Sequence, residues 1–174
     1  FHGTTTAELV IPRATFGMNG NAFRCSVVSN GNGSAVASEP ATLSVRGVDP
    51  ADFDHDRTSD LLWENPETGA HVLWFVRGGA YCGWADLGFV PPEWHLVGRA
   101  DMNEDATPDI IWENTVTGAR GVWLMNGSTY VAWADLGSAP LEWHIVGTGD
   151  FDGDGGPDIV WENTSTGARG IWLM

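Results

Sequence analysis

The sequence predicts an all-β protein built from repeated sheets, and three observations support this fold class. The six residues from Asp60 to Asn65 return almost unchanged 49 residues later, and again after another 49 residues. The apolar residues alternate with polar ones or form short runs of strand length, and helical periodicity is absent. A Thr-Gly pair closes a turn in every repeat, at Gly69, Gly118 and Gly167, where a hairpin loop needs a residue with positive φ.

Each repeat is expected to hold four short strands. Some of them, such as residues 122–125, are apolar on both faces, so each sheet must be covered on both sides. Repeats of about 40–50 residues with four strands are typical of the blades of a β-propeller, and one blade cannot bury its own faces. In the second repeat the strands are expected at residues 94–98, 110–113, 121–125 and 130–136.

The repeats therefore predict a partial β-propeller of about 2.7 four-stranded blades with a 49-residue period. The blades are expected at residues 48–90, 91–139 and 140–174, the last of them truncated. Closure needs roughly 4–8 blades, so further blades of the same chain are expected after Met174. All ten tryptophans recur at fixed places in the repeats. We interpret them as packing between blades; an aromatic platform for sugars is the alternative.

The first 47 residues do not follow the repeat. They resemble the last three strands of an immunoglobulin-like domain, in which Cys25 would lie in the penultimate strand, two residues after Phe23. Residues 1–47 are therefore expected to be the C-terminal half of an immunoglobulin-like β-sandwich, and residues 48–174 the blades that follow it. Strands of the first segment are expected at residues 7–11, 19–28 and 41–45, the last two forming a hairpin.

The composition excludes several classes of partner. The chain has 8 basic and 23 acidic residues and a net charge of −15, which repels nucleic acids and anionic lipids. No apolar run approaches the roughly 18 residues that a membrane-spanning helix needs, so membrane insertion is not expected. Two cysteines are too few for a disulfide framework. Cys82 is expected to be a small core residue.

An acidic loop lies between the first two expected strands of each repeat. When its first aspartate is counted as position 1, side chains with oxygen atoms occupy positions 1, 3, 5 and 9 in all three loops. Alternate residues of a tight loop point inward, so this spacing gathers the oxygens around one point. The members are Asp52, Asp54, Asp56 and Asp60 in the first loop, Asp101, Asn103, Asp105 and Asp109 in the second, and Asp150, Asp152, Asp154 and Asp158 in the third.

Such clusters are expected to need a cation. Two carboxylates about 4 Å apart repel by roughly 1 kcal/mol in water and about 4 kcal/mol at an effective dielectric of 20. Oxygen ligands with irregular spacing suit Ca²⁺ better than Mg²⁺, so one Ca²⁺ per repeat, up to three in the chain, is predicted. The second loop, with its asparagine, is expected to bind most weakly; the alternative is a set of solvated acidic turns. Backbone carbonyls at position 7 would add a ligand, from Thr58, Thr107 or Gly156.

The third loop carries the clearest family signature. Its sequence from Gly149 to Trp161 resembles the FG-GAP (VCBS-type) repeat of integrin α-subunit propellers and of many bacterial secreted proteins. The resemblance covers residues 48–174. It implies a propeller, Ca²⁺ in the loop between the first two strands of a blade, and a role in adhesion or ligand binding. The first two loops depart from the family at Asn103 and at positions 4 and 6, where the family prefers glycine; those positions hold His55, Arg57, Glu104 and Ala106.

Catalysis is not expected. Glu64, Glu113 and Glu162 recur in every repeat, whereas an active site is usually made once, and no nucleophile motif is present. His95 and His144 also recur, without the spacing of zinc ligands, and are expected to form structural hydrogen bonds.

The sequence thus predicts a non-catalytic module, secreted or on the surface of a bacterial cell, in which Ca²⁺ stabilises each blade and the propeller binds a protein or glycan ligand. Loops with a Kd of about 10⁻⁴–10⁻³ M suit the calcium concentration outside cells. Two alternatives remain open. One is an ancillary propeller of a secreted carbohydrate- or lipid-active enzyme, and the other is a passive surface spacer.

Overall fold

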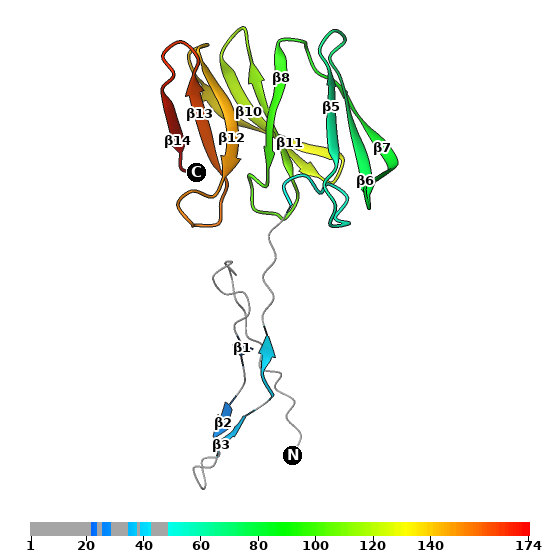
Figure 1. The fold of residues 1–174 in the computed structure, drawn as a ribbon, viewed down its shortest axis with the longest axis vertical. Helices are drawn as coiled ribbons and strands as arrows, with labels where there is room; N and C mark the ends of the chain where they lie inside the picture. The colour runs from blue at the N-terminus through cyan, green and yellow to red at the C-terminus, as the bar shows by residue number, and fades with distance from the viewer. Residues whose placement is uncertain (1–21, 24–25, 29–34, 38, 43–48) are drawn as a thin grey trace. The chain divides into compact units, whose positions relative to one another are not determined.

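The structure is a computed structural model that describes residues 22–23, 26–28, 35–37, 39–42 and 49–174. The chain divides into two compact units, residues 1–47 and 48–174. All regular structure in the described residues is β-strand, and the strands form antiparallel sheets, none of which closes on itself (Figure 1). The predicted all-β class is confirmed.

Among its described residues, the first unit contains two short strand pairs. The expected pairing of the segment at 19–28 with the segment at 41–45 is found only in part: Ala22 lies opposite Thr42, but residues 26–28 pair with residues 35–37, where no strand was expected. The immunoglobulin-like assignment depends on the strand at 7–11 and on Cys25, which lie outside the described residues. The pairs are β1 (Ala22–Phe23) with β4 (Ala41–Thr42), and β2 (Ser26–Val28) with β3 (Ala35–Ala37).

The second unit consists of three sheets that follow one another in chain order and lie side by side (Figure 1). The first contains β5 (Leu61–Asn65), β6 (Ala70–Arg77) and β7 (Ala80–Phe89). The second contains β8 (Trp94–Ala100), β9 (Asp109–Asn114), β10 (Ala119–Asn126) and β11 (Thr129–Ser138). The third contains β12 (Trp143–Gly149), β13 (Asp158–Asn163) and β14 (Arg169–Trp172).

The second sheet matches the expected four-stranded repeat strand for strand. The other two sheets have three strands each in the described part of the chain. In the first repeat, the position of β8 falls on residues 45–51, most of which are not described; in the third, the position of β11 falls after Met174. The strands also share their irregularities, because β8 and β12 have the same register shift, between Leu96 and Gly98 and between Ile145 and Gly147.

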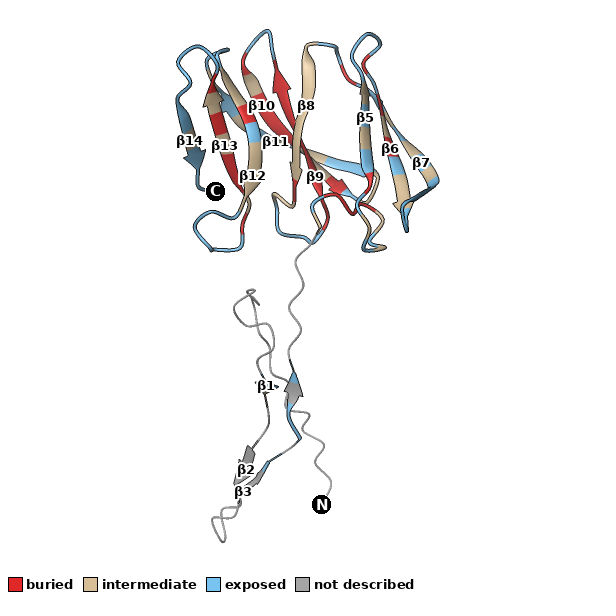
Figure 2. Cartoon of the chain, viewed as in Figure 1, coloured by how far each residue is buried: buried red, intermediate tan, exposed pale blue. Residues whose placement is uncertain are grey.

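The hydrophobic core lies between the sheets. Ile110 of β9 is fully buried against the first sheet, and its neighbour Ile111 is fully buried against the third. Adjacent residues of a strand point to opposite faces, so β9 is covered on both sides, as its apolar sequence predicts; Figure 2 shows the burial concentrated on β9, β10 and β13. The buried members are Phe53, Leu73, Val90, Ile110, Trp112 and Met125 in one cluster, and Ile111, Val122, Ile145, Ile159 and Trp161 in the other.

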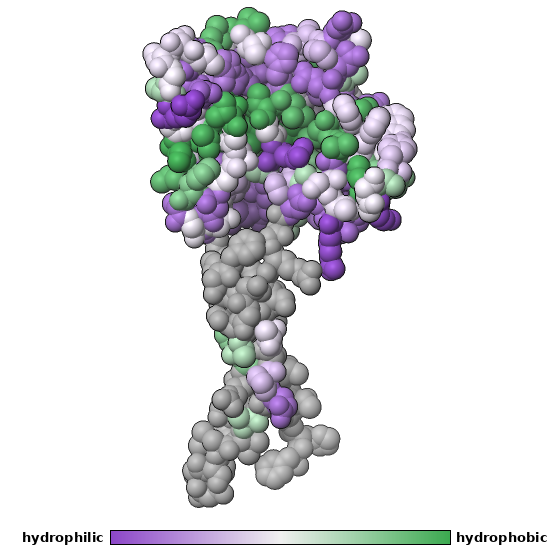
Figure 3. Space-filling view, viewed as in Figure 1, coloured by the Kyte–Doolittle hydropathy of each residue, from purple (hydrophilic) through white to green (hydrophobic). Residues whose placement is uncertain are grey.

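The tryptophans follow the predicted packing only where a neighbouring sheet covers them. Trp112 and Trp161 are buried between sheets, whereas Trp63 and Trp84 on the first sheet are 47% and 57% exposed. In Figure 3, hydrophobic side chains form a band across the middle of the second unit, between hydrophilic rims. The prediction for Cys82 is wrong: this thiol is exposed on β7, because β7 is an outer strand with no sheet beyond it among the described residues.

A repeated hydrogen bond between a histidine and a glutamate links neighbouring sheets. Nδ1 of His95, on β8, donates to Oε1 of Glu64, on β5, over 2.9 Å, and the backbone N–H of Leu96 donates to the same carboxylate. The next two sheets have the same tie, from His144 to Glu113 over 2.5 Å. The expected structural hydrogen bonds of the two histidines are confirmed, and their acceptors are the repeated glutamates.

A buried arginine adds a second tie, which sequence reasoning missed. The side chain of Arg120, on β10, is 1% exposed; it donates to the carbonyl of Trp143 over 2.5 Å and lies 3.3 Å from the carboxylate of Glu113. Its guanidinium also lies 5.7 Å from the ring centre of Trp161. His71 takes the equivalent place on β6, buried edge-on against the tryptophan of β9. Recurrence at the 49-residue period was the signal that could have revealed these residues.

Candidate metal centres

The three acidic loops, residues 52–60, 101–109 and 150–158, lie at the same edge of their sheets (Figure 1). The second loop connects β8 to β9 and the third connects β12 to β13, so both lie between the first two strands of their sheets. The first loop leads directly into β5. The repeat thus presents the same set of oxygen atoms three times along one edge.

The aspartate at position 9 is a buried anchor in each loop. Asp60, Asp109 and Asp158 have no solvent exposure. One carboxylate oxygen accepts the N–H of position 2 of the loop, and the other accepts an N–H from the end of the strand that follows the Thr-Gly turn. For Asp109 these donors are Met102 at 2.9 Å and Met125 at 2.8 Å. The carboxylate therefore fixes the loop to its own sheet.

The aspartate at position 1 organises the loop backbone. Asp52 and Asp101 accept the N–H groups of positions 5 and 6 at distances of 2.8 to 3.0 Å. Asp150 accepts those of positions 4 and 6 at 2.6 and 3.0 Å. These bonds wrap each loop around its own carboxylates, so the inward direction of the side chains is set by the local backbone.

The loop backbone is left-handed at positions 4 and 6 in all three loops. This conformation costs a residue with a side chain roughly 1–2 kcal/mol, and glycine adopts it freely. The φ angles are 59° at His55, 75° at Arg57, 60° at Glu104, 71° at Ala106, 81° at Gly153 and 94° at Gly155.

The structure brings three carboxylates together in two of the loops. In the first loop they belong to positions 1, 3 and 9, and in the third loop to the same positions. Within each group, one ligand atom from every residue lies within 4.8 Å of the others, so each group could hold a metal ion. The groups are Asp52, Asp54 and Asp60, and Asp150, Asp152 and Asp158.

The aspartate at position 5 is turned to other partners. In the first loop, Asp56 accepts from the hydroxyl of Thr58 and from Nε of Arg77, the latter over 2.6 Å. Arg77 also lies 3.5 Å from Asp54, and its side chain is 66% exposed. An exposed pair of this kind contributes little to stability, because water screens it. Arg77 therefore supplies a weak internal counter-charge that sequence reasoning missed; the second repeat has Asn126 in its place.

The second loop keeps the backbone pattern with a different set of side chains. Asn103 accepts the N–H of Asp105 with its amide oxygen over 3.1 Å and donates its amide nitrogen to the Asp105 carboxylate over 3.0 Å. No group of three clustered acids is found in this loop among the described residues. The expected weakness of this site stays a prediction, and the structure gives it a reason, since one carboxylate is replaced by a neutral amide.

Burial makes several of these carboxylates costly to charge. It raises the pKa of Asp101 and of Asp109, although backbone N–H groups donated to both oppose the rise. Burial also raises the pKa of Asp54, with Asp60 and Asp56 adding repulsion. The pKa of Asp56 moves the other way, because Thr58 and then Arg77 donate to it. A cation placed among the inward carboxylates would favour their charged form, and so offset both the cost of burying them and their mutual repulsion.

The arrangement is suited to holding a hard cation. The repeated glutamates that could have suggested glycoside hydrolysis are engaged by His95, by His144 and, at Glu162, by Arg169 over 2.6 Å.

No helix in the described part of the chain is long and apolar enough to cross a bilayer. Comparisons with protein-family models, with curated proteins and with solved structures found no match.

Proposed function

We propose that the chain is part of a non-catalytic extracellular module of the propeller type, in which Ca²⁺ holds the acidic loop of each repeat and the module binds a protein or glycan. The observation that carries the proposal is the convergence of three carboxylates at the same place in two separate repeats. A chance acidic turn would not be wrapped by the same backbone hydrogen bonds, 49 and 98 residues apart.

The donor set favours Ca²⁺ among the common metal ions. Every inward side chain offers oxygen, which hard cations prefer, and neither histidine nor cysteine enters the described clusters. Ca²⁺ accepts 6–8 oxygens in irregular geometry, whereas Mg²⁺ needs a near-ideal octahedron. Positions 1, 3 and 9 would supply the carboxylates, and the backbone at position 7 and water would complete the coordination.

A structural role for the ion follows from its position. The loops are braced by buried carboxylates that also hold the strand after each Thr-Gly turn, so an ion bound there would stabilise the sheet itself. A ligand present at 100 times its Kd stabilises the folded state by about 2.7 kcal/mol per site. Calcium outside cells reaches the concentrations that weak loops of this type require, which is the support for placing the module there.

The metal proposal is tested by calorimetric titration of CaCl₂ into the chelator-treated chain, with melting temperatures measured in parallel. We expect saturable binding, with the second loop weakest, and a higher melting temperature in calcium. The double variant Asp150→Asn with Asp152→Asn should lose one equivalent. The control Asp135→Asn changes an exposed aspartate of β11 outside the loops and should bind like the parent chain. Absence of binding and of any thermal shift at about 10 mM Ca²⁺, above the weakest affinity expected, would refute the proposal.

The binding role is tested separately, on arrays of glycans and of extracellular matrix proteins in calcium. A ligand that is lost when calcium is chelated supports the module as a calcium-stabilised binder. A calcium-loaded chain without any ligand in either class would favour the spacer.

A further inference from the structure

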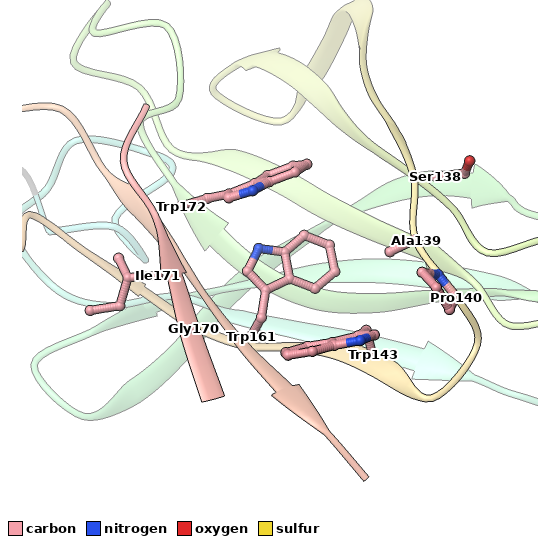
Figure 4. A pocket seen from close by; sticks show the side chains of 8 residues that line it. All are labelled: Ser138, Ala139, Pro140, Trp143, Trp161, Gly170, Ile171 and Trp172. Carbon is pink, nitrogen blue, oxygen red and sulfur yellow. The ribbon is translucent and has the colours of Figure 1, made fainter. Parts of the chain in front are cut away.

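Two cavities of the second unit are lined by uncharged residues alone. Their volumes are about 380 and 240 Å³, and tryptophans form much of both linings. Figure 4 shows the larger cavity, with the indoles of Trp143, Trp161 and Trp172 around it. These cavities offer no carboxylate to a cation, whereas the acidic loops do. In the first loop the carboxylates also meet a cationic side chain of the protein itself, that of Arg77.

The aspartate at position 5 uses its two oxygens differently in the first two loops. Oδ1 accepts the backbone N–H of position 7 over 2.8 Å in both of them. Oδ2 of Asp56 accepts Nε of Arg77 over 2.6 Å. Oδ2 of Asp105 instead accepts the amide nitrogen of Asn103 over 3.0 Å. The first loop therefore pairs this oxygen with a positive charge, and the second pairs it with a neutral donor.

The buried anchor at position 9 places Arg77 beside the first loop. Oδ1 of Asp60 accepts the N–H of Val76 over 3.0 Å, which fixes the end of β6 next to the loop. Arg77 follows directly, and its guanidinium also lies 3.5 Å from Asp54, one of the three clustered carboxylates. The second repeat has the same anchor, and the residue that follows it is Asn126. The repeat thus fixes this position next to the loop, and the residue type decides whether it carries a charge.

We propose that Arg77 sets the calcium affinity of the first loop by competing with the ion for Asp56 and Asp54. The inference rests on the proposed binding of Ca²⁺ to the loops. An ion that uses Oδ2 of Asp56 must displace the guanidinium, and an ion that does not use it binds with one ligand fewer. In both cases the guanidinium repels the ion. Calcium binding should therefore release the Arg77 side chain from Asp56.

The charges set the expected size of the effect. A single and a double positive charge about 6 Å apart in water change an affinity roughly 10-fold. The Arg77 side chain is 66% exposed, so salt screens part of this repulsion. We expect that removing the guanidinium strengthens calcium binding at the first loop by about 3- to 10-fold.

The test is a titration of the full 174-residue chain with CaCl₂, followed by ¹⁵N NMR, which reports each loop separately. The backbone N–H of position 6 donates to the position 1 aspartate in every loop, so its resonance should shift when that loop binds. Arg77→Gln should tighten binding at the first loop about 3- to 10-fold and leave the other two loops unchanged. In the parent chain, the Nε resonance of Arg77 should move toward that of a solvated arginine as the first loop fills.

Two further variants control for charge and for position. Arg57→Gln makes the same chemical change at position 6 of the same loop, where the side chain is exposed and has no ion pair among the described residues. It should change the affinity by less than about twofold, because solvent and salt screen a more distant charge. Asn126→Arg places a guanidinium at the equivalent, exposed position beside the second loop. It should weaken calcium binding there and leave the first loop unchanged.

The outcomes distinguish a failure of this inference from a failure of the metal proposal. Equal calcium affinity of the first loop in the parent chain and in Arg77→Gln would overturn the inference and leave the metal proposal intact. Equal gains from Arg77→Gln and Arg57→Gln would also overturn it, since net charge and not the contact with Asp56 would then set the affinity. Absence of calcium binding at every loop would overturn the metal proposal, and this inference with it.

Discussion

Replacing Arg120 with methionine should lower the free energy of unfolding much more than the same replacement of Arg169. The two arginines occupy equivalent places, 49 residues apart, on β10 and β14. Arg120 is 1% exposed and lies between the second and third sheets, whereas the Arg169 side chain is 69% exposed. The pair of variants therefore compares one chemical change in a covered and an uncovered setting.

The structure sets the size of the difference. Without Arg120, the carboxylate of Glu113, 2% exposed, keeps only His144 and one backbone N–H as partners, and the carbonyl of Trp143 loses its donor. Breaking a buried ion pair from one side costs about 3–5 kcal/mol. Loss of the exposed bond from Arg169 to Glu162 costs at most about 1 kcal/mol.

The free energy of unfolding is measured by urea titration of the full chain, with chelator present so that metal binding does not contribute. Tryptophan fluorescence reports the transition, since ten indoles lie in the repeats. We expect Arg120→Met to lose about 3 kcal/mol more than Arg169→Met. Adding Glu113→Gln to Arg120→Met should recover part of the loss, because the uncompensated buried charge is removed. Losses within about 1 kcal/mol of each other would refute the assignment of a buried inter-sheet ion pair.

Two further predictions concern His71 and the loop backbone. Burial lowers the pKa of His71 below its ordinary value of 6.5, against the opposing charge of Glu64. The folded chain then holds this proton less tightly than the unfolded chain, so the contribution of His71 is complete above pH 6.5 and declines as the pH falls through the lowered pKa. Replacing His71 with arginine, which the second repeat has at the equivalent position, should make the free energy of unfolding depend less on pH below 6.5. Parallel plots of this free energy against pH for the variant and the parent chain would contradict the prediction. Gly155→Ala should destabilise by about 1–2 kcal/mol in thermal unfolding, and Ala106→Gly should stabilise by about 0.5–1 kcal/mol, because both positions are left-handed; equal melting temperatures would contradict the strain argument.

The strands and turns were predictable because they depend on local chemistry. The Thr-Gly turns place Gly69, Gly118 and Gly167 at φ of 72°, 77° and 72°, as the hairpin interpretation requires. The apolar pair Ile110 and Ile111 predicts a strand covered on both faces, and the two residues enter different cores. The 49-residue period extends these local patterns to the whole second unit.

The partners across sheets could not be predicted from local patterns. The tie from Glu64 to His95 joins residues 31 positions apart, and nothing in either segment indicates which glutamate faces which histidine. Exposure depends on neighbours in the same way: Trp63 and Trp112 are equivalent in sequence, yet one is 47% and the other 1% exposed. The sequence likewise gave no sign that Arg77 would reach the first acidic loop.

The acidic loops are structurally coupled to the inter-sheet cores, because position 2 of each loop carries a large apolar side chain. Phe53 is 1% exposed in the core between the first and second sheets, and Met102 packs against the core between the second and third. The N–H of each is held by the position 9 aspartate of the same loop, at 2.9 Å in both cases. Phe151, the third member, is 53% exposed, since no described sheet follows its own. A cation that orders a loop would therefore also hold an apolar side chain in the contact with the next sheet. In a repeat array, stability is approximately the sum of the sheets and their contacts, so the proposed Ca²⁺ would strengthen the contacts as well as the sheets.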